Sequence, residues 1–159
     1  MYGGFSSGLG LLQIAPLDLQ QVEVIKGANS TLYGGGAIAG LVNLVTKKPG
    51  IEPETSMLLN ATSAGGLDAS GFHTSTQGSL GKRIFASYNK SDAYDSADNG
   101  FSAIPEFERW TLNPHLFIEN SNSQFSLGFN AVKENRIGGD MDYIDGDRNA
   151  VAYFEKIAT

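Results

Sequence analysis

Length, composition and charge narrow the kinds of protein that this sequence can encode. The chain has 159 residues, carries a formal net charge of −6 and contains no cysteine. The acidic balance argues against nucleic-acid binding, which needs clustered basic residues, and the lack of cysteine excludes disulfides, thiolate metal sites and cysteine nucleophiles. With 20 glycines and only 18% charged residues, the composition favours strands and turns over a helical bundle.

The first fifty residues predict a small α/β unit. Residues 16–21 begin with proline, which is well tolerated at the start of a helix, and are typical of a short helical turn. Two strands are predicted over 22–27 and 41–46, with the three glycines at 34–36 breaking the chain between them. Glu23 stands between apolar neighbours, so it needs either solvent or a partner. Such a unit is too short to bury a good core alone.

Beyond Pro53 the apolar residues recur with a period of two, which predicts β-strands. The pattern is clearest over 110–119, where one face carries Trp110, Leu112, Pro114, Leu116 and Ile118. Further candidate strands cover 57–63, 72–80, 84–89, 124–131 and 150–157. They make about six strands, each near the roughly 9–11 residues that a membrane β-strand needs. No stretch approaches the ~18 apolar residues of a transmembrane helix.

The predicted strands are joined by connections that alternate in length. The turns at 81–83 and 120–123 are short, whereas the segments 91–108 and 133–149 are long. This alternation is typical of outer-membrane barrels, in which Trp110 would lie in the aromatic girdle beside a long loop. A soluble antiparallel sheet with its apolar face, including Trp110, on a core predicts the same period. Both interpretations stay open on this pattern.

Two local patterns suggest chemistry that the surrounding sequence does not support. Residues 4–8 fit the pattern G-x-S-x-G around Ser6, but a nucleophile elbow needs a preceding strand, and only three residues precede Gly4. The aspartate-rich segment 140–147 suggests calcium, but its spacing is one residue off an EF-hand loop and favours a solvated acidic loop. We therefore predict no catalytic residue, no metal site and no cofactor, with loop calcium as the alternative.

Residues 21–49 carry a longer pattern, QVEVIKGANSTLYGGGAIAGLVNLVTKKP. It resembles the end of the plug domain of TonB-dependent outer-membrane receptors, whose pattern is roughly V-E-V-I-R-G-P-x-S-x-L-Y-G-x-G-A-I-G-G-x-I-N-I-x-T-K. Residues 110–146 resemble early barrel strands of the same family, especially those of its Bacteroidetes group. Two positions depart from the family pattern: Lys26 stands in place of arginine, and Ala28 in place of proline.

The resemblance implies a mainly β fold, a fragment of a plugged transmembrane β-barrel preceded by the end of a small α/β plug domain. We expect residues 1–50 to form the C-terminal part of the plug. Residues 51–159 would then form about six of the roughly 22 strands of such a barrel, too few to close one. The length, which first suggests one domain, thus predicts a fragment.

The family resemblance also implies a function in the bacterial outer membrane. Such receptors bind a scarce ligand (an iron–siderophore, cobalamin or a glycan) at the cell surface and import it to the periplasm. Energy would come from the TonB–ExbB–ExbD complex, through a segment that we expect to lie outside this sequence. The implied partners are that complex, the ligand and outer-membrane lipid, with no nucleic acid and no enzymatic step.

Candidate ligand contacts follow from the same resemblance. They would come from an apical plug loop and the two long loops, through Tyr2, Phe5, Ser6, Ser7, Tyr94, Asp98, Phe101, Asp140, Asp142 and Tyr143. Lys26 would lock the plug to the barrel wall, where it keeps the charge of the family's arginine but lacks its planar fork. A soluble or periplasmic β-rich binding module with no transport role stays the alternative, and an esterase built on Ser6 is a distant third.

Overall fold

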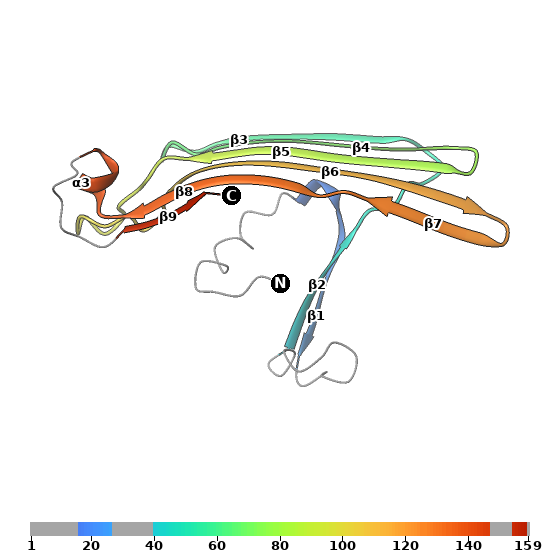
Figure 1. Cartoon of the computed structure of the whole chain (residues 1–159), viewed down its shortest axis with the longest axis horizontal. Helices are drawn as coiled ribbons and strands as arrows, with labels where there is room; N and C mark the ends of the chain where they lie inside the picture. The colour runs from blue at the N-terminus through green and yellow to red at the C-terminus, as the bar shows by residue number, and fades with distance from the viewer. Residues whose placement is uncertain (1–15, 27–39, 147–153, 159) are drawn as a thin grey trace. The chain divides into compact units, whose positions relative to one another are not determined.

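The chain forms two compact units, residues 1–48 and residues 49–159, each of which is described by itself. A computed structural model describes residues 16–26, 40–146 and 154–158 (Figure 1). The three glycines at 34–36, which are expected to break the chain, lie outside these residues. In the described part of the chain, no helix is long and apolar enough to cross a membrane.

The first unit is built on one antiparallel strand pair. A 3-10 turn, η1 (Pro16–Asp18), leads into β1 (Leu19–Lys26), which pairs with β2 (Gly40–Thr46). The helical turn is shorter than predicted, because Leu19 already pairs with Thr46 in the ladder. Glu23 has the partner that its apolar surroundings require, since the Asn43 side-chain amide donates to its carboxylate at 2.8 Å.

The second unit is a single antiparallel sheet of long strands. Its order is β3-β4-β5-β6-β8-β9, with β7 also paired to β6. The elements are β3 (Glu54–Ala61), β4 (Leu67–Gln77), β5 (Leu80–Ser91), β6 (Glu106–Asn120), β7 (Ser123–Gly128), β8 (Ala131–Gly139), the short helix α3 (Met141–Ile144) and β9 (Phe154–Ala158). The prediction that 133–139 belongs to a loop is wrong, because these residues continue the ladder with β6.

Pro114 explains why one long strand is divided into β7 and β8. Both segments pair with β6 in the same register, with Gly128 opposite His115 and Ala131 opposite Leu112. Between them, the Phe129 N–H donates to the Pro114 carbonyl at 3.0 Å, but proline has no N–H to donate in return. The missing hydrogen bond interrupts the ladder without shifting it.

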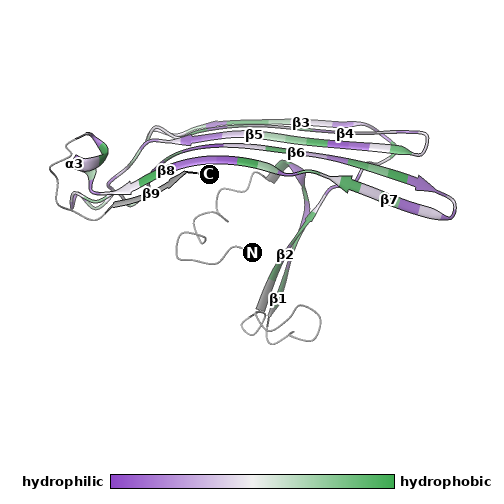
Figure 2. Ribbon diagram, in the orientation of Figure 1, coloured by the Kyte–Doolittle hydropathy of each residue, from purple (hydrophilic) through white to green (hydrophobic). Residues whose placement is uncertain are grey.

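One face of this sheet is apolar and uncovered, and we call it the apolar face. Figure 2 shows hydrophobic and hydrophilic residues interspersed along the strands. The register places on it Met57, Leu59, Ile84, Trp110, Leu112, Leu116, Ile118, Phe125, Leu127 and Phe129, all of which are exposed. Met57 is 85% exposed and Phe129 63%. In a soluble protein this face would pack on a core. Its exposed apolar side chains are therefore typical of a sheet that contacts lipid on this side.

The opposite face, here called the polar face, carries the buried side chains. Six of them are polar or charged: Ser70, Thr74, Arg83, Ser87, Asn89 and Arg136. They hydrogen-bond along the sheet, as where Arg83 donates to the Asn113 side-chain oxygen and Asn89 donates to Asp68, both at 2.8 Å. Burial of polar groups on one face and exposure of apolar groups on the other is the reverse of a soluble sheet.

A charged network on the polar face ties β6 to β8. The Glu134 carboxylate accepts from Arg109 at 2.8 Å and from Arg136 at 2.7 Å. Arg109 binds it through both Nη2 and Nε. Both guanidinium groups lie 5.9 Å from the centre of the buried Phe107 ring. Charge-assisted hydrogen bonds of this geometry are among the stronger polar contacts in proteins.

The two faces give a direct test with adjacent residues. Leu112→Lys places a charge on the apolar face, and we expect it to lower the free energy of unfolding in lipid vesicles by about 2 kcal/mol. Thr111→Lys places the same charge on the polar face and should cost less than about 1 kcal/mol. Equal losses for the two variants in denaturant titrations would contradict the assignment of the faces.

The charged network predicts that loss of a carboxylate costs more stability on the polar face than on the apolar face. Glu134→Gln leaves two largely buried guanidinium groups without their shared carboxylate, and we expect a loss of about 3 kcal/mol in the free energy of unfolding. Glu108→Gln, on the other face of the sheet, is the matched control and should cost less than about 1 kcal/mol. Denaturant unfolding of both variants, side by side, measures the difference.

Candidate ligand-binding surface

The long connections of the sheet gather at one of its ends, together with α3 (Figure 1). They are the β5–β6 loop (residues 92–105) and the described part of the β8–β9 connection (residues 140–146). The tight turns at 78–79 and 121–122 lie at the opposite end. The alternation of short and long connections predicted from the sequence is therefore present, but its bounds differ. The tight turn predicted at 81–83 lies at 78–79, the first long connection covers 92–105, and the second begins at 140 and leads to Phe154.

Backbone hydrogen bonds join the two loops into one surface. The Met141 N–H donates to the Gly100 carbonyl at 2.9 Å, and Ser102 exchanges two hydrogen bonds of 2.8 Å with Gly139. Phe101 and Asp140 face each other in an isolated β-bridge. Residues far apart in the sequence thus meet at the loop end, because antiparallel hairpins return the chain to it.

Asp95 organises the tip of the β5–β6 loop. Its carboxylate accepts from the backbone N–H groups of Ala97, Asn99 and Gly100, at 2.7 to 3.0 Å. Desolvation raises the pKa of Asp95, but the hydrogen bonds from the backbone outweigh it and hold the pKa below its usual value. The loop contacts of Asp95 are therefore fully formed above its ordinary pKa and are lost only as the pH falls through the lowered value.

Asp140 has a similar local role in the second loop. It is the N-cap of α3, and its side chain accepts from the Asp142 N–H at 2.8 Å. Two of the aspartates at the loop end thus bind backbone groups. Within the described residues, no group of three or more His, Asp and Glu side chains is placed to hold a metal ion.

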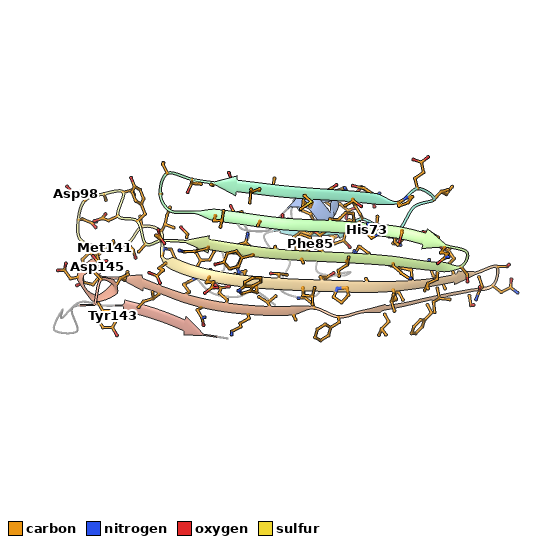
Figure 3. The ribbon with its side chains drawn as sticks, turned by 90° about the horizontal axis from the view of Figure 1, so that it is seen from above. His73, Phe85, Asp98, Met141, Tyr143 and Asp145 are labelled. Atoms are coloured by element: carbon orange, nitrogen blue, oxygen red, sulfur yellow. The ribbon has the colours of Figure 1, made fainter. Side chains whose placement is uncertain are left out.

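The predicted contact residues of the long loops lie together at this end of the sheet. Tyr94 is 45% exposed and Phe101 46%, so both rings are available to a ligand. Asp98 adopts a left-handed backbone conformation (φ 52°) at the loop tip. Figure 3 shows Asp98, Tyr143 and the flanking Met141 and Asp145 at the same end.

The predicted contact residues of the first unit cannot be placed in this way. Tyr2, Phe5, Ser6 and Ser7 lie outside the described residues. Lys26 is the last residue of β1 and pairs with Gly40, but the structure describes only its backbone. The proposed lock and apical loop therefore stay predictions.

Sequence reasoning missed the residues that hold the loops together. Ser102 and Gly139 have no distinctive pattern, whereas the Asn99-Gly100 pair is a recognisable turn signal. It also missed the charged network, although Glu134 and Arg136 stand two residues apart, as strand neighbours on one face do. Their partner Arg109 is visible only once β6 and β8 are paired.

Comparison with known proteins identifies related sequences. The family described as TonB-dependent Receptor Plug Domain matches residues 1–41. The rhizobactin receptor of Rhizobium meliloti is 28% identical over 147 residues (86% of this chain and 19% of the relative). The ferripyoverdine receptor of Pseudomonas aeruginosa is 34% identical over 122 residues, which are 72% of this chain and 14% of the relative. The ferric aerobactin receptor of Klebsiella pneumoniae is 47% identical over 60 residues, which are 38% of this chain and 8% of the relative.

The chain spans between 8% and 19% of the length of these relatives. No solved structure gives a significant match. The plug match covers residues 1–41 of the N-terminal unit, and the two longer alignments cover 86% and 72% of the chain, so they extend into the sheet. The chain belongs to the TonB-dependent receptors of the bacterial outer membrane.

Proposed function

We propose that this chain belongs to a receptor that binds a ferric siderophore at the cell surface and imports it to the periplasm. The observation that carries the proposal is the similarity to receptors named for ferric aerobactin, rhizobactin and ferripyoverdine. The sheet is consistent with this role, because lipid on its apolar face leaves the polar face toward the interior of a barrel. Cobalamin and glycans, which the family resemblance also allows, lack this support.

The two units take different parts in the proposed mechanism. We assign residues 1–50 to the end of the plug and residues 51–159 to about six barrel strands. Rearrangement of the plug would admit the ligand, and Lys26 would lock the plug to the barrel wall. Energy would come from the TonB–ExbB–ExbD complex. No bond in the ligand needs to be made or broken, so the proposal includes no catalytic residue.

The loop end is proposed as the outward-facing ligand surface. Tyr94 and Phe101 offer half-exposed rings, and Asp98, Asp140, Asp142 and Tyr143 lie on the same joined loops. Aromatic side chains supply rigid contact area at a low cost in conformational entropy. The hydrogen bonds between the loops organise this surface before the ligand arrives, which lowers the cost of ordering it on binding. Tyr2, Phe5, Ser6 and Ser7 would complete the site from the plug.

Transport assays test the proposed function. The gene product that carries this sequence is expressed in a strain without its own siderophore receptors, with and without functional TonB, and is supplied with radiolabelled iron as aerobactin, rhizobactin or pyoverdine chelates. We expect TonB-dependent uptake of at least one chelate. Uptake of labelled cobalamin or a glycan instead would overturn the ligand class, and uptake that is independent of TonB would overturn the mechanism.

The organised loop yields a prediction about affinity. Asp95→Ala removes the acceptor of three backbone hydrogen bonds, so the loop must pay its ordering cost on binding, and we expect the Kd of the ferric chelate to rise roughly three- to tenfold. Asp92→Ala, in the same loop, removes only an exposed contact of 3.6 Å to Lys90 and is the control. Isothermal titration of both variants measures the effect.

Acid titration adds a separate check of the same loop. Because the pKa of Asp95 is lowered, protonation of Asp95 should not change ligand binding by the unaltered chain between pH 7 and about pH 5.

A loss of affinity in Asp92→Ala equal to that in Asp95→Ala would show that the hydrogen bonds of Asp95 do not organise the binding surface.

A further inference from the structure

The tip of the β5–β6 loop carries a chemically labile dipeptide, Asn99-Gly100, which is the only Asn-Gly pair in the chain. Asparagine is thermolabile, because the nitrogen of the following peptide group can attack its side-chain carbonyl carbon. The attack is least hindered before glycine, which has no Cβ. Both residues are exposed and follow Asp98 at the loop end of the sheet (Figure 3).

The carboxamide of Asn99 is folded toward the nitrogen that would attack it. Its Oδ1 accepts from the Phe101 N–H, with 3.0 Å between oxygen and nitrogen, which is the hydrogen bond of an Asx turn. This bond bends the side chain back over the peptide bond between Asn99 and Gly100. Gly100 has a left-handed backbone (φ 82°), and a Cβ atom there would meet nothing within 4 Å. The space beside Gly100 is therefore open to the Asn99 side chain.

Asp95 holds the attacking nitrogen. Its Oδ2 accepts from the Gly100 N–H at 2.7 Å and from the Asn99 N–H at 2.9 Å. Desolvation raises the pKa of Asp95, but the hydrogen bonds from the backbone hold it below its usual value, so the carboxylate is ionised at neutral pH. An ionised carboxylate that touches an N–H can take its proton as the nitrogen forms a new bond. Asp95 is thus placed as the base for Gly100.

The Phe101 N–H completes the arrangement. It donates to Asn99 Oδ1, the oxygen on which negative charge develops when the carbonyl carbon becomes tetrahedral. A fixed backbone donor at this position stabilises such an oxyanion. Nucleophile, base and oxyanion donor therefore converge on one carboxamide, and a single short loop supplies all three.

We propose that this loop promotes the deamidation of its own Asn99. The Gly100 nitrogen forms a bond to Asn99 Cγ and gives its proton to Asp95. The Nδ2 group takes up that proton and leaves as ammonia, which closes a succinimide ring and restores the carboxylate. Water, the only other reactant, then opens the ring and leaves aspartate or isoaspartate at position 99.

The modification would alter the surface that the two loops share. Isoaspartate lengthens the backbone by one carbon and adds one negative charge. The Gly100 carbonyl accepts from the Met141 N–H at 2.9 Å, so a longer backbone just before Gly100 displaces a hydrogen bond that joins the loops. The inference goes beyond the proposed transport function, because it rests on the loop alone and would hold whichever ligand the receptor imports.

Mass spectrometry of the incubated protein tests the proposal. The gene product that carries this sequence is purified in detergent, incubated at neutral pH and digested, and deamidation is followed at each asparagine. Isoaspartate is detected by enzymatic methylation. A synthetic peptide of residues 94–104 reports the rate without the folded loop, and we expect Asn99 to react roughly tenfold faster in the protein. Asn122, exposed in a tight turn before serine, is the internal control and should stay almost unmodified.

Two variants of the same loop test the role of Asp95. Asp95→Asn keeps the size of the side chain and one oxygen acceptor but removes the base, so we expect the rate at Asn99 to fall about tenfold, to that of the peptide. Asp92→Asn is the matched control. The Asp92 carboxylate contacts Lys90 at 3.6 Å and takes no part in the arrangement around Asn99, so its loss should leave the rate unchanged.

The outcomes that overturn the proposal are distinct. A rate at Asn99 in the protein that is equal to or below that of the peptide would show that the folded loop does not promote the reaction. An unchanged rate in Asp95→Asn, or equal slowing in Asp95→Asn and Asp92→Asn, would show that Asp95 is not the base. Because the comparison with the peptide uses the unaltered protein, it tests the proposal even if Asp95→Asn fails to fold.

Discussion

The structure depends on one constraint: a sheet with its apolar face uncovered needs lipid on that side. Met57 and Phe129 are exposed there, while Arg83 and Asn89 are buried on the polar face. In water, exposure of apolar surface costs about 25 cal/mol per Å². In a bilayer the same surface is well solvated, provided that the backbone groups are paired, as the ladders from β3 to β9 pair them. The described sheet is open at β3 and β9, so a closed wall needs further strands at both edges.

The same constraint gives each position along a strand a depth in the membrane. On the apolar face, β6 carries Leu116 and Leu112, then Trp110, and then Glu108 toward the loops. The change from aliphatic to aromatic to charged side chains follows the change from acyl chains to headgroups to water. On the polar face no such order is needed. Arg109 can therefore lie one residue from Trp110, because Glu134 neutralises it locally.

The predictable strands are those in which apolar and polar residues already alternate within the strand's own sequence. The alternation over 110–118 gives β6 and its exposed face correctly, and 41–46 gives β2 almost to the residue. The start of β4 was missed, because Asp68, Ser70 and Gly71 are poor strand formers that acquire partners only in the sheet. Residues 133–139 were missed for the same reason. Their charged side chains suggest a loop until pairing with β6 supplies counter-charges.

The loop end shows why counting residue types overestimates what a site can bind. The sequence suggests a ligand or calcium surface from its aspartates, but Asp95 and Asp140 accept hydrogen bonds from their own backbone. An acceptor already occupied in this way organises a loop and offers less to a ligand. The half-exposed rings of Tyr94 and Phe101 carry no such internal role. The recognition surface proposed here is thus aromatic at its centre, with carboxylates that shape the loops around it.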